Sequence, residues 1–170
     1  MTGEYRFCPR CGAALSSLYT GRDAGRPACH ACGFIHYENP AVTVFGLIER
    51  DGLFLVLRRA HEPYAGAWDM AGGFVEPGEH PEHALLREIA EETQLHVELD
   101  GLVGVYTSRY GEGRHTVDIA FACRVVGGEL AISDEKSESR WITPDEIPPM
   151  AFDAQSTALQ TLVRNRQMTS

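Results

Sequence analysis

Three glutamates share one side of an expected helix and are the residues of this chain best suited to metal chemistry. Glu88, Glu91 and Glu92 stand three and four positions apart, so a helix over about residues 81–93 brings their carboxylates together. Like charges repel one another there, and a divalent cation that prefers hard oxygen ligands relieves this repulsion. The spacing therefore favours a Mg²⁺ or Mn²⁺ site. The alternative is a solvated acidic helix face.

Two cysteine pairs near the N-terminus have the spacing of a different metal site. Cys8-Pro-Arg-Cys11 and Cys29-His-Ala-Cys32 are separated by 17 residues, which is typical of a zinc ribbon with four thiolate ligands. Gly12 and Gly33 follow the pairs and suit the positive φ of such turns. Four thiolates leave no open coordination position, so we expect a structural Zn²⁺ at Cys8, Cys11, Cys29 and Cys32. Another metal and free or redox-active thiols are the alternatives.

Residues 73–95 read GFVEPGEHPEHALLREIAEETQL and resemble the Nudix box, G-x5-E-x7-R-E-U-x-E-E, where U is aliphatic. The matching positions are Gly73, Glu79, Arg87, Glu88, Ile89, Glu91 and Glu92, with Leu95 in the final aliphatic place. Gln94 stands where the family usually has glycine, and a positive φ there would cost a residue with a side chain about 1 kcal/mol. The resemblance covers roughly residues 41–147. It implies an α/β fold, the Nudix α/β/α sandwich with a mixed sheet, preceded by a small zinc ribbon.

The resemblance also implies an activity, namely Mg²⁺-dependent hydrolysis of a nucleoside diphosphate linked to another group. A pyrophosphate repels an attacking hydroxide, so the catalyst must neutralise the phosphate oxygens and supply a deprotonated water in line. Carried over by position, Glu88 and Glu92 would hold Mg²⁺ or Mn²⁺, Glu91 would hold the metal or orient the water, and the backbone carbonyl of Gly72 would complete the inner shell.

Supporting roles follow from the same resemblance. Arg87 and Glu79 would orient the metal-binding carboxylates, and Arg87 also lies about a hundred degrees round the helix from Glu88, where it could brace Glu79. The general base of this family comes from the box helix or from a later loop. Here the later candidates are Glu138 and Glu135, which precede Trp141.

Aromatic and basic side chains near the expected cleft are candidates for contact with the substrate. Phe74 and Tyr110 could stack on a base, with core or loop packing as the alternative. Arg58, with Arg59 beside it, ends an expected strand and could grip phosphate bidentately. A solvated strand end is the alternative for this arginine pair.

A ribbon followed by the box, with AGGFVE at residues 71–76, resembles the NADH pyrophosphatase branch of the family. Two departures count against a full match: residues 105–110 read VYTSRY in place of a Ser-Gln-Pro-Trp-Pro-Phe-Pro-type array, and the chain has no room for the additional domain that precedes the ribbon in that branch. We therefore expect ADP-ribose or a nucleotide-sugar-like diphosphate ahead of NADH. Dinucleoside polyphosphates and nucleoside triphosphates are further alternatives.

Composition limits the function classes further. The chain has 170 residues, a formal net charge of −9 and 44% hydrophobic residues, which predicts one main domain, 38–170, behind a small ribbon, 1–37. The acidic balance argues against a general nucleic-acid surface. No apolar run is long enough to span a membrane and the N-terminus has no signal-peptide core, so we expect a cytoplasmic protein that takes a small nucleotide as substrate. The resemblance is compatible with a homodimer.

Strands and helices mix along the main domain. Apolar runs predict strands at 41–48 and 53–57 joined by an Asp51-Gly52 hairpin turn, and further strands at 102–110, 116–125 and 139–142. Helices are expected at 81–93 and 154–166, and a loop at 61–73.

The alternative to an enzyme is a protein that only binds its ligands. In it, the zinc ribbon docks on a nucleic acid or a protein, and the Nudix-like domain senses a nucleotide without cleaving it. Sensors usually lose their metal carboxylates, whereas this chain keeps all of them.

Overall fold

The computed structural model describes residues 5–17, 21–111 and 113–169. The chain divides into two compact units, Met1–Asn39 and Pro40–Ser170. In the smaller unit, β1 (Ser16–Ser17) pairs antiparallel with β2 (Pro27–Ala28). Within the described residues, no helix combines the length and the apolar character that crossing a membrane requires.

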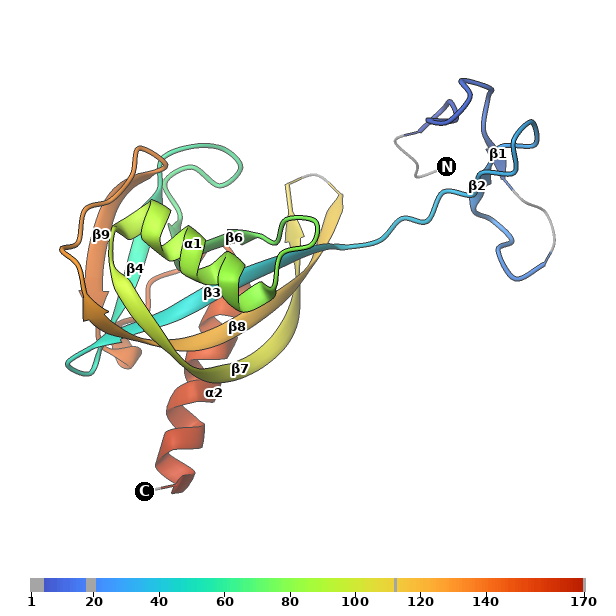
Figure 1. The fold of residues 1–170 in the computed structure, drawn as a ribbon. Helices are drawn as coiled ribbons and strands as arrows, with labels where there is room; N and C mark the ends of the chain where they lie inside the picture. Colours follow the sequence, from blue (N-terminus) through green and yellow to red (C-terminus); the bar gives the residue numbers. More distant parts are fainter. Residues whose placement is uncertain (1–4, 18–20, 112, 170) are drawn as a thin grey trace. The chain divides into compact units, whose positions relative to one another are not determined.

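The larger unit is built on a mixed sheet (Figure 1). Its strands run in the order β5-β4-β3-β8-β7, while β6 pairs with β3 and β9 pairs with β4. The pairing of β3 with β8 is parallel, and the other pairs are antiparallel. The strands are β3 (Ala41–Arg50), β4 (Leu53–Arg59), β5 (Trp68–Asp69), β6 (Gly72–Phe74), β7 (His96–Tyr110), β8 (Arg114–Gly127) and β9 (Lys136–Ile142).

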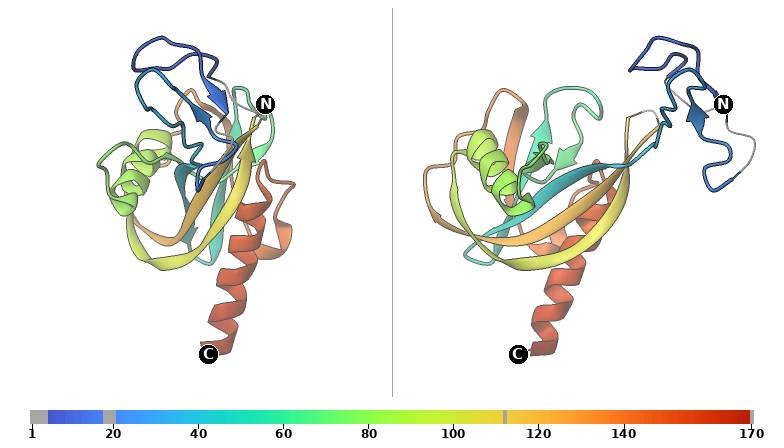
Figure 2. Two further views of the ribbon diagram at one scale, coloured as in Figure 1. Left: turned by 90° about the vertical axis from the view of Figure 1, so that its right-hand side faces the viewer. Right: turned by 45° about the vertical axis from the view of Figure 1, so that its right-hand side comes forward.

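Two helices cover opposite faces of this sheet, α1 (Pro81–Thr93) and α2 (Asp153–Thr169), and the short 3₁₀ helix η1 (Pro144–Glu146) precedes α2 (Figure 2). The alternation of side chains along β3 explains the arrangement. Val44 and Ile48 join the core beneath α1, whereas Phe45 and Leu47 join the core beneath α2. The sheet therefore lies between two helical layers, which confirms the predicted α/β/α sandwich.

Most elements match the sequence-based expectations, and α1 has the predicted bounds. The hairpin turn is confirmed, because Asp51 and Gly52 both have positive φ values, 52° and 79°. Two expectations were wrong. The loop at 61–73 contains the short strands β5 and β6, and the strand expected at 102–110 begins at His96. Register shifts along β7, including one between Leu99 and Gly101, break the two-residue period that marks a strand in the sequence.

Gln94 ends α1 in the left-handed conformation, which favours glycine. Its φ is 58°, and its backbone N–H donates to the carbonyl of Ala90 over 3.0 Å. The non-glycine residue is therefore accommodated at the helix exit, at a conformational cost on the order of 1 kcal/mol.

Candidate active site

Gly72 and Gly73 let the sheet approach α1 closely. In the β3–β6 pair, Gly73 lies opposite Val44 and Gly72 opposite Phe45. A Cβ atom at Gly72 would lie 2.1 Å from the carbonyl oxygen of Val44, and one at Gly73 would lie 2.4 Å from the carboxylate of Glu88. Such distances leave no space for a methyl group, so both positions require glycine. The glycine pair thus brings the backbone of β6 against the acidic face of α1.

Arg87 ties the carboxylates of this region together. Its Nε and Nη2 donate to the two oxygens of Glu79 over 2.9 and 3.0 Å, and its Nη1 donates to Glu88 over 2.8 Å and to Glu91 over 3.2 Å. Its Nη2 also reaches the carbonyl of Phe74. Hydrogen bonds from Arg87 lower the pKa of Glu79 to about 2. A bidentate guanidinium of this kind fixes the orientation of its partners.

Glu92 is a buried carboxylate, Glu88 is partly buried, and both line a common cavity. Their side chains are 17% and 5% exposed. Burial raises the pKa of Glu88, an effect that the hydrogen bond from Arg87 opposes. Burial raises the pKa of Glu92 to about 7, although Lys136 opposes it. Because burial disfavours both charged forms, an added cation near these oxygens is favourable.

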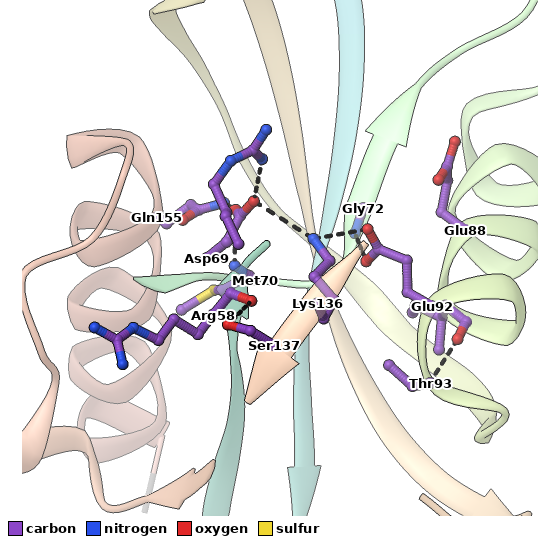
Figure 3. A network of polar contacts seen from close by, with 12 residues as sticks. Arg58, Asp69, Met70, Gly72, Glu88, Glu92, Thr93, Lys136, Ser137 and Gln155 are labelled. Carbon is purple, nitrogen blue, oxygen red and sulfur yellow. Dashed lines mark hydrogen bonds and ion pairs between the residues drawn. The ribbon is translucent and has the colours of Figure 1, made fainter. Parts of the chain in front are cut away.

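Glu92 is held from two sides in the structure (Figure 3). Its Oε1 lies 2.7 Å from Nζ of Lys136, and its Oε2 accepts a 3.1 Å hydrogen bond from the backbone N–H of Gly72. Each carboxylate oxygen has a second lone pair available for another ligand.

A second buried carboxylate, Asp69 at the end of β5, lies beside this pair. Its Oδ2 lies 2.6 Å from Nη1 of Arg59 and 3.6 Å from Nζ of Lys136, and its Oδ1 accepts a 2.5 Å hydrogen bond from Nε2 of Gln155 (Figure 3). The network therefore joins β4, β5, β9 and the first turn of α2 to Glu92 on α1. The network is polar and largely buried, so each charge in it depends strongly on its neighbours.

The cavity has a volume of about 490 Å³ and combines an acidic end with an aromatic wall. Phe74, Tyr110 and Phe152 line it together with Glu88 and Glu92. The rings of Tyr110 and Phe152 stack with centroids 6.1 Å apart, and Phe74 meets Tyr110 edge-on at 5.3 Å. Aromatic surface of this kind suits a planar base, and the acidic end suits a metal-bound phosphate group.

Polar atoms without a protein partner also border this cavity. Asp118 accepts a 2.5 Å hydrogen bond from Thr43 through Oδ1, while its Oδ2 has no hydrogen-bond partner among the described residues. The Nε2 of Gln155 is fixed by Asp69, which leaves its Oε1 as a second buried acceptor without a partner in the described structure. Both acceptors are buried, so each is an unsatisfied polar atom close to the cavity wall.

The structure brings together some of the sequence-predicted residues and separates others. Gly72, Phe74, Arg87, Glu88, Glu92 and Tyr110 line the cavity. Glu79 and Glu91 are not among its lining residues and reach it through Arg87.

Arg58 and Glu138 are not brought into the cavity. Nη1 of Arg58 lies 3.4 Å from Oε2 of Glu138 on an exposed part of the β4–β9 pair, and Nε of Arg58 donates to the carbonyl of Gly66. Their neighbours Arg59 and Glu135 line the cavity instead. Consecutive side chains of a strand point to opposite sides, and the β4–β9 register also shifts between Arg58 and Arg59, which the sequence pattern does not reveal.

Sequence reasoning missed several cavity residues: Asp69, Asp118, Lys136, Phe152 and Gln155. A signal for one of them was present. Lys136 is the single lysine of a chain with fourteen arginines. A basic residue type that occurs once marks its position as unusual.

The cysteine pairs converge in the smaller unit. The sulfur atoms of Cys8, Cys11, Cys29 and Cys32 all lie within 4.8 Å of one another. The two turns that carry them repeat the same pattern: the N–H of Gly12 donates to the carbonyl of Cys8, the N–H of Gly33 donates to that of Cys29, and both glycines have a φ of 75°. This arrangement suits one tetrahedral metal ion with four thiolate ligands.

Comparisons with known proteins agree with this geometry. A family model described as "NUDIX domain" matches residues 38–162, and one described as "Nudix N-terminal", a zinc ribbon, matches residues 6–38. The crystal structure of a NUDIX hydrolase from Nitrosomonas europaea has a TM-score of 0.78 and 29% identity, and the match covers 92% of this chain and 91% of that one.

Two relatives carry names that specify a substrate. The ADP-ribose pyrophosphatase of Methanocaldococcus jannaschii is 42% identical over 118 residues, which are 69% of this chain and 70% of that protein. The NAD-capped RNA hydrolase NudC of Pseudomonas fluorescens is 29% identical over 148 residues, which are 86% of this chain and 51% of that protein. The match to the second relative thus spans about half of its length.

Proposed function

The chain belongs to the Nudix family, and from that premise we propose that it hydrolyses the pyrophosphate bond of a nucleoside diphosphate linked to another group, with ADP-ribose as its preferred substrate. The observation that carries this proposal is the cavity, which is lined both by the carboxylates of Glu88 and Glu92 and by the stacked rings of Tyr110 and Phe152. A nucleotide diphosphate needs both features, because its phosphates require cations and its base requires an apolar surface.

The residues present fit a divalent cation of the Mg²⁺ or Mn²⁺ type. The donor set consists of hard carboxylate oxygens, and the space beside Glu88 is kept open by Gly73, where a Cβ would collide with the carboxylate. We assign Glu88 and Glu92 as metal ligands, with Glu91 and the backbone carbonyl of Gly72 as further oxygen ligands. When bound, the cation supplies charge neutralisation for the phosphate oxygens and lowers the pKa of a bound water.

The other residues then have distinct tasks. Arg87 and Glu79 keep Glu88 in position, as their hydrogen bonds support. Glu135, which lines the cavity, takes the role of general base in this proposal, since Glu138 lies outside the lining and pairs with Arg58. Attack of water on one phosphorus breaks the P–O–P bridge, so ADP-ribose yields AMP and ribose 5-phosphate.

The aromatic wall supports a substrate with a base or a second planar group. Tyr110 and Phe152 offer a stacked pair, and the polar side chains of Asp118 and Gln155 border the same cavity, where a substrate places amine and hydroxyl groups. ADP-ribose carries all of these groups, as does NADH. We rank ADP-ribose first because the relative with that named activity has 42% identity, against 29% for the NAD-capped RNA hydrolase.

For the smaller unit we propose a structural Zn²⁺ held by the four thiolates. A closed set of four ligands leaves no position for substrate or water, so this ion would stabilise the ribbon without taking part in hydrolysis. Thiolate ligands persist in reducing compartments, which is why we propose a cytoplasmic location.

The test is product analysis with ADP-ribose, NADH, a nucleotide sugar and a dinucleoside tetraphosphate, each with and without Mg²⁺. We expect AMP and ribose 5-phosphate from ADP-ribose at the highest kcat/KM, and complete loss of turnover when a chelator removes free divalent cations. Binding of these nucleotides without turnover on any of them would contradict hydrolysis and support a nucleotide sensor.

A further inference from the structure

Lys136 is the only lysine in the sequence, whereas arginine occurs fourteen times. Its side chain is 3% exposed, and it lines the cavity at the start of β9. Lysine is almost never fully buried without a partner of opposite charge. A compact ammonium group occupies this position, and it differs from the planar and larger guanidinium of arginine, whose donor directions are fixed.

Two carboxylates face this ammonium group at unequal distances. Nζ lies 2.7 Å from Oε1 of Glu92 and 3.6 Å from Oδ2 of Asp69. Asp69 has two other side-chain partners, Arg59 at 2.6 Å and Gln155 at 2.5 Å, and also accepts from the backbone N–H of Met70. Among the described residues, Lys136 is the only cation within 4 Å of the Glu92 carboxylate. Glu92 therefore depends on Lys136 for its counter-charge, whereas Asp69 does not.

The backbone around Lys136 is tied to the same helix end as Glu92. The N–H of Ser133 donates to the backbone carbonyl of Glu92 over 3.1 Å, and the N–H of Lys136 donates to the carbonyl of Ser133 over 3.1 Å. The carbonyl of Glu135 accepts from the N–H of Ala60, just after β4. These bonds fix the backbone of Lys136, so its ammonium group can move only by rotation of the side chain.

We propose that Lys136 is a positioning residue that holds Glu92 in place before a divalent cation binds. When the cation binds, the ammonium group of Lys136 leaves Glu92 and pairs with Asp69 instead. The inference rests on the proposed function, in which Glu92 is a metal ligand. Two cations that share one carboxylate repel each other, and Asp69 offers a neighbouring acceptor at 3.6 Å. In the metal-free protein, Lys136 thus supplies the positive charge beside Glu92, and it releases Glu92 when the divalent cation binds.

The single lysine makes the exchange directly observable in the unmodified chain. Protein grown with ¹³C,¹⁵N-lysine gives one side-chain Nζ–Cε signal from Lys136, and we expect this signal to shift in a saturable manner as Mg²⁺ is added. Its midpoint should coincide with that of Mg²⁺ binding measured by calorimetry on the same sample. In Asp69→Asn, which removes the negative charge of the alternative partner, the shift should be smaller than in the wild type.

Lys136→Met supplies a second, independent measurement. Without divalent cations its melting temperature should fall by about 5 °C or more, because Glu92 is left without a counter-charge. Added Mg²⁺ should raise it by at least about twice the wild-type increment, and Mg²⁺ should bind at least about threefold more tightly. The matched control, Arg124→Met, removes an exposed cation paired with Glu98 and should leave Mg²⁺ affinity unchanged.

The outcomes separate this inference from the proposed function. If Mg²⁺ neither binds nor supports hydrolysis, the metal assignment itself is wrong, and Lys136 has no cation with which to exchange. If Mg²⁺ binds and hydrolysis proceeds but the Lys136 signal stays fixed, the exchange is refuted while the proposed function stands. Unchanged or weaker Mg²⁺ binding in Lys136→Met would overturn the exchange in the same way.

Discussion

Gly73 and Glu88 are in such close contact that a Cβ atom at Gly73 would lie 2.4 Å from the carboxylate carbon of Glu88. Gly73→Ala should therefore displace the proposed metal ligand, lower kcat by about tenfold or more and reduce the melting temperature by a few degrees. Steady-state kinetics and thermal unfolding measure the two effects.

The control for this substitution is Gly127→Ala, where the nearest atom to the added Cβ is Nδ1 of His96 at 3.6 Å, an ordinary contact. If Gly73→Ala behaves like Gly127→Ala in both measurements, the close approach has no functional role.

The Arg87–Glu79 pair predicts a pH dependence of stability. Hydrogen bonds from Arg87 lower the pKa of Glu79 from 4.5 to about 2. A lowered folded-state pKa contributes stability above the unfolded pKa, and this contribution is lost as the pH falls towards 2. Glu79→Gln should thus lower the melting temperature most at neutral pH, and its difference from wild type should shrink between pH 4.5 and pH 2.

Thermal unfolding across that pH range checks this prediction, with Glu129→Gln, an exposed loop substitution, as the control. A difference between Glu79→Gln and wild type that stays constant from pH 7 to pH 2 would count against a stabilising Arg87–Glu79 pair.

The stacked rings of Tyr110 and Phe152 predict a specific kinetic effect. Phe152→Ala removes one face of the aromatic wall, and base stacking on a side chain contributes about 1–3 kcal/mol. We expect KM for ADP-ribose to rise roughly tenfold or more while kcat stays within a few-fold of wild type. Leu102→Ala, at an exposed residue of β7, is the control, and an equal KM for both variants would remove Phe152 from the substrate site.

The four-thiolate site predicts that the protein can lose its zinc and still hydrolyse its substrate. Cys8→Ser should release Zn²⁺ and loosen the ribbon, since metal binding and folding are coupled in such modules. Hydrolysis by the Nudix domain should partly survive. Elemental analysis of protein purified without chelator measures the metal, with Cys123→Ala as the control because Cys123 is buried in the main core. Wild-type protein without zinc would contradict the assignment.

Helix α1 and the first hairpin could be predicted because their signals are local. Leu85 and Ile89 stand four apart on the buried side of α1, Pro81 occupies its first turn, and Asp51-Gly52 matches the turn that joins β3 to β4. Each of these signals arises within a few consecutive residues, where helix and turn chemistry are decided.

The buried polar network could not be predicted, because its members are far apart in sequence. Asp69 and Gln155 are separated by 86 positions, and each lies in a polar or mixed stretch that is typical of a surface. Lys136 follows Asp134 and Glu135 in a segment that reads as a solvated loop. Burial of these groups depends on long-range packing of β4, β5, β9 and α2, and residue type alone predicts exposure.

The central claim is that Glu88 and Glu92 on α1 bind the catalytic metal. Glu88→Gln and Glu92→Gln each remove a charged ligand at the point where the transition state gathers negative charge, so we expect kcat to fall by about 10² or more. The fold should persist in Glu88→Gln because burial raises the pKa of that carboxyl and a neutral side chain avoids the cost. It should persist in Glu92→Gln because Asp69 stays as a counter-charge for the buried Lys136, although the melting temperature falls. Glu82→Gln, on the same helix with a side chain that is 52% exposed, is the control.

The measurement is kcat for ADP-ribose at saturating Mg²⁺ for Glu88→Gln, Glu92→Gln and Glu82→Gln, alongside their melting temperatures. We expect a loss of about 10² or more in the first two variants and a change of less than about twofold in the third, with all three folded. If Glu88→Gln and Glu92→Gln retain turnover within a few-fold of wild type, or if Glu82→Gln is equally damaging, the metal site does not lie on this face of α1.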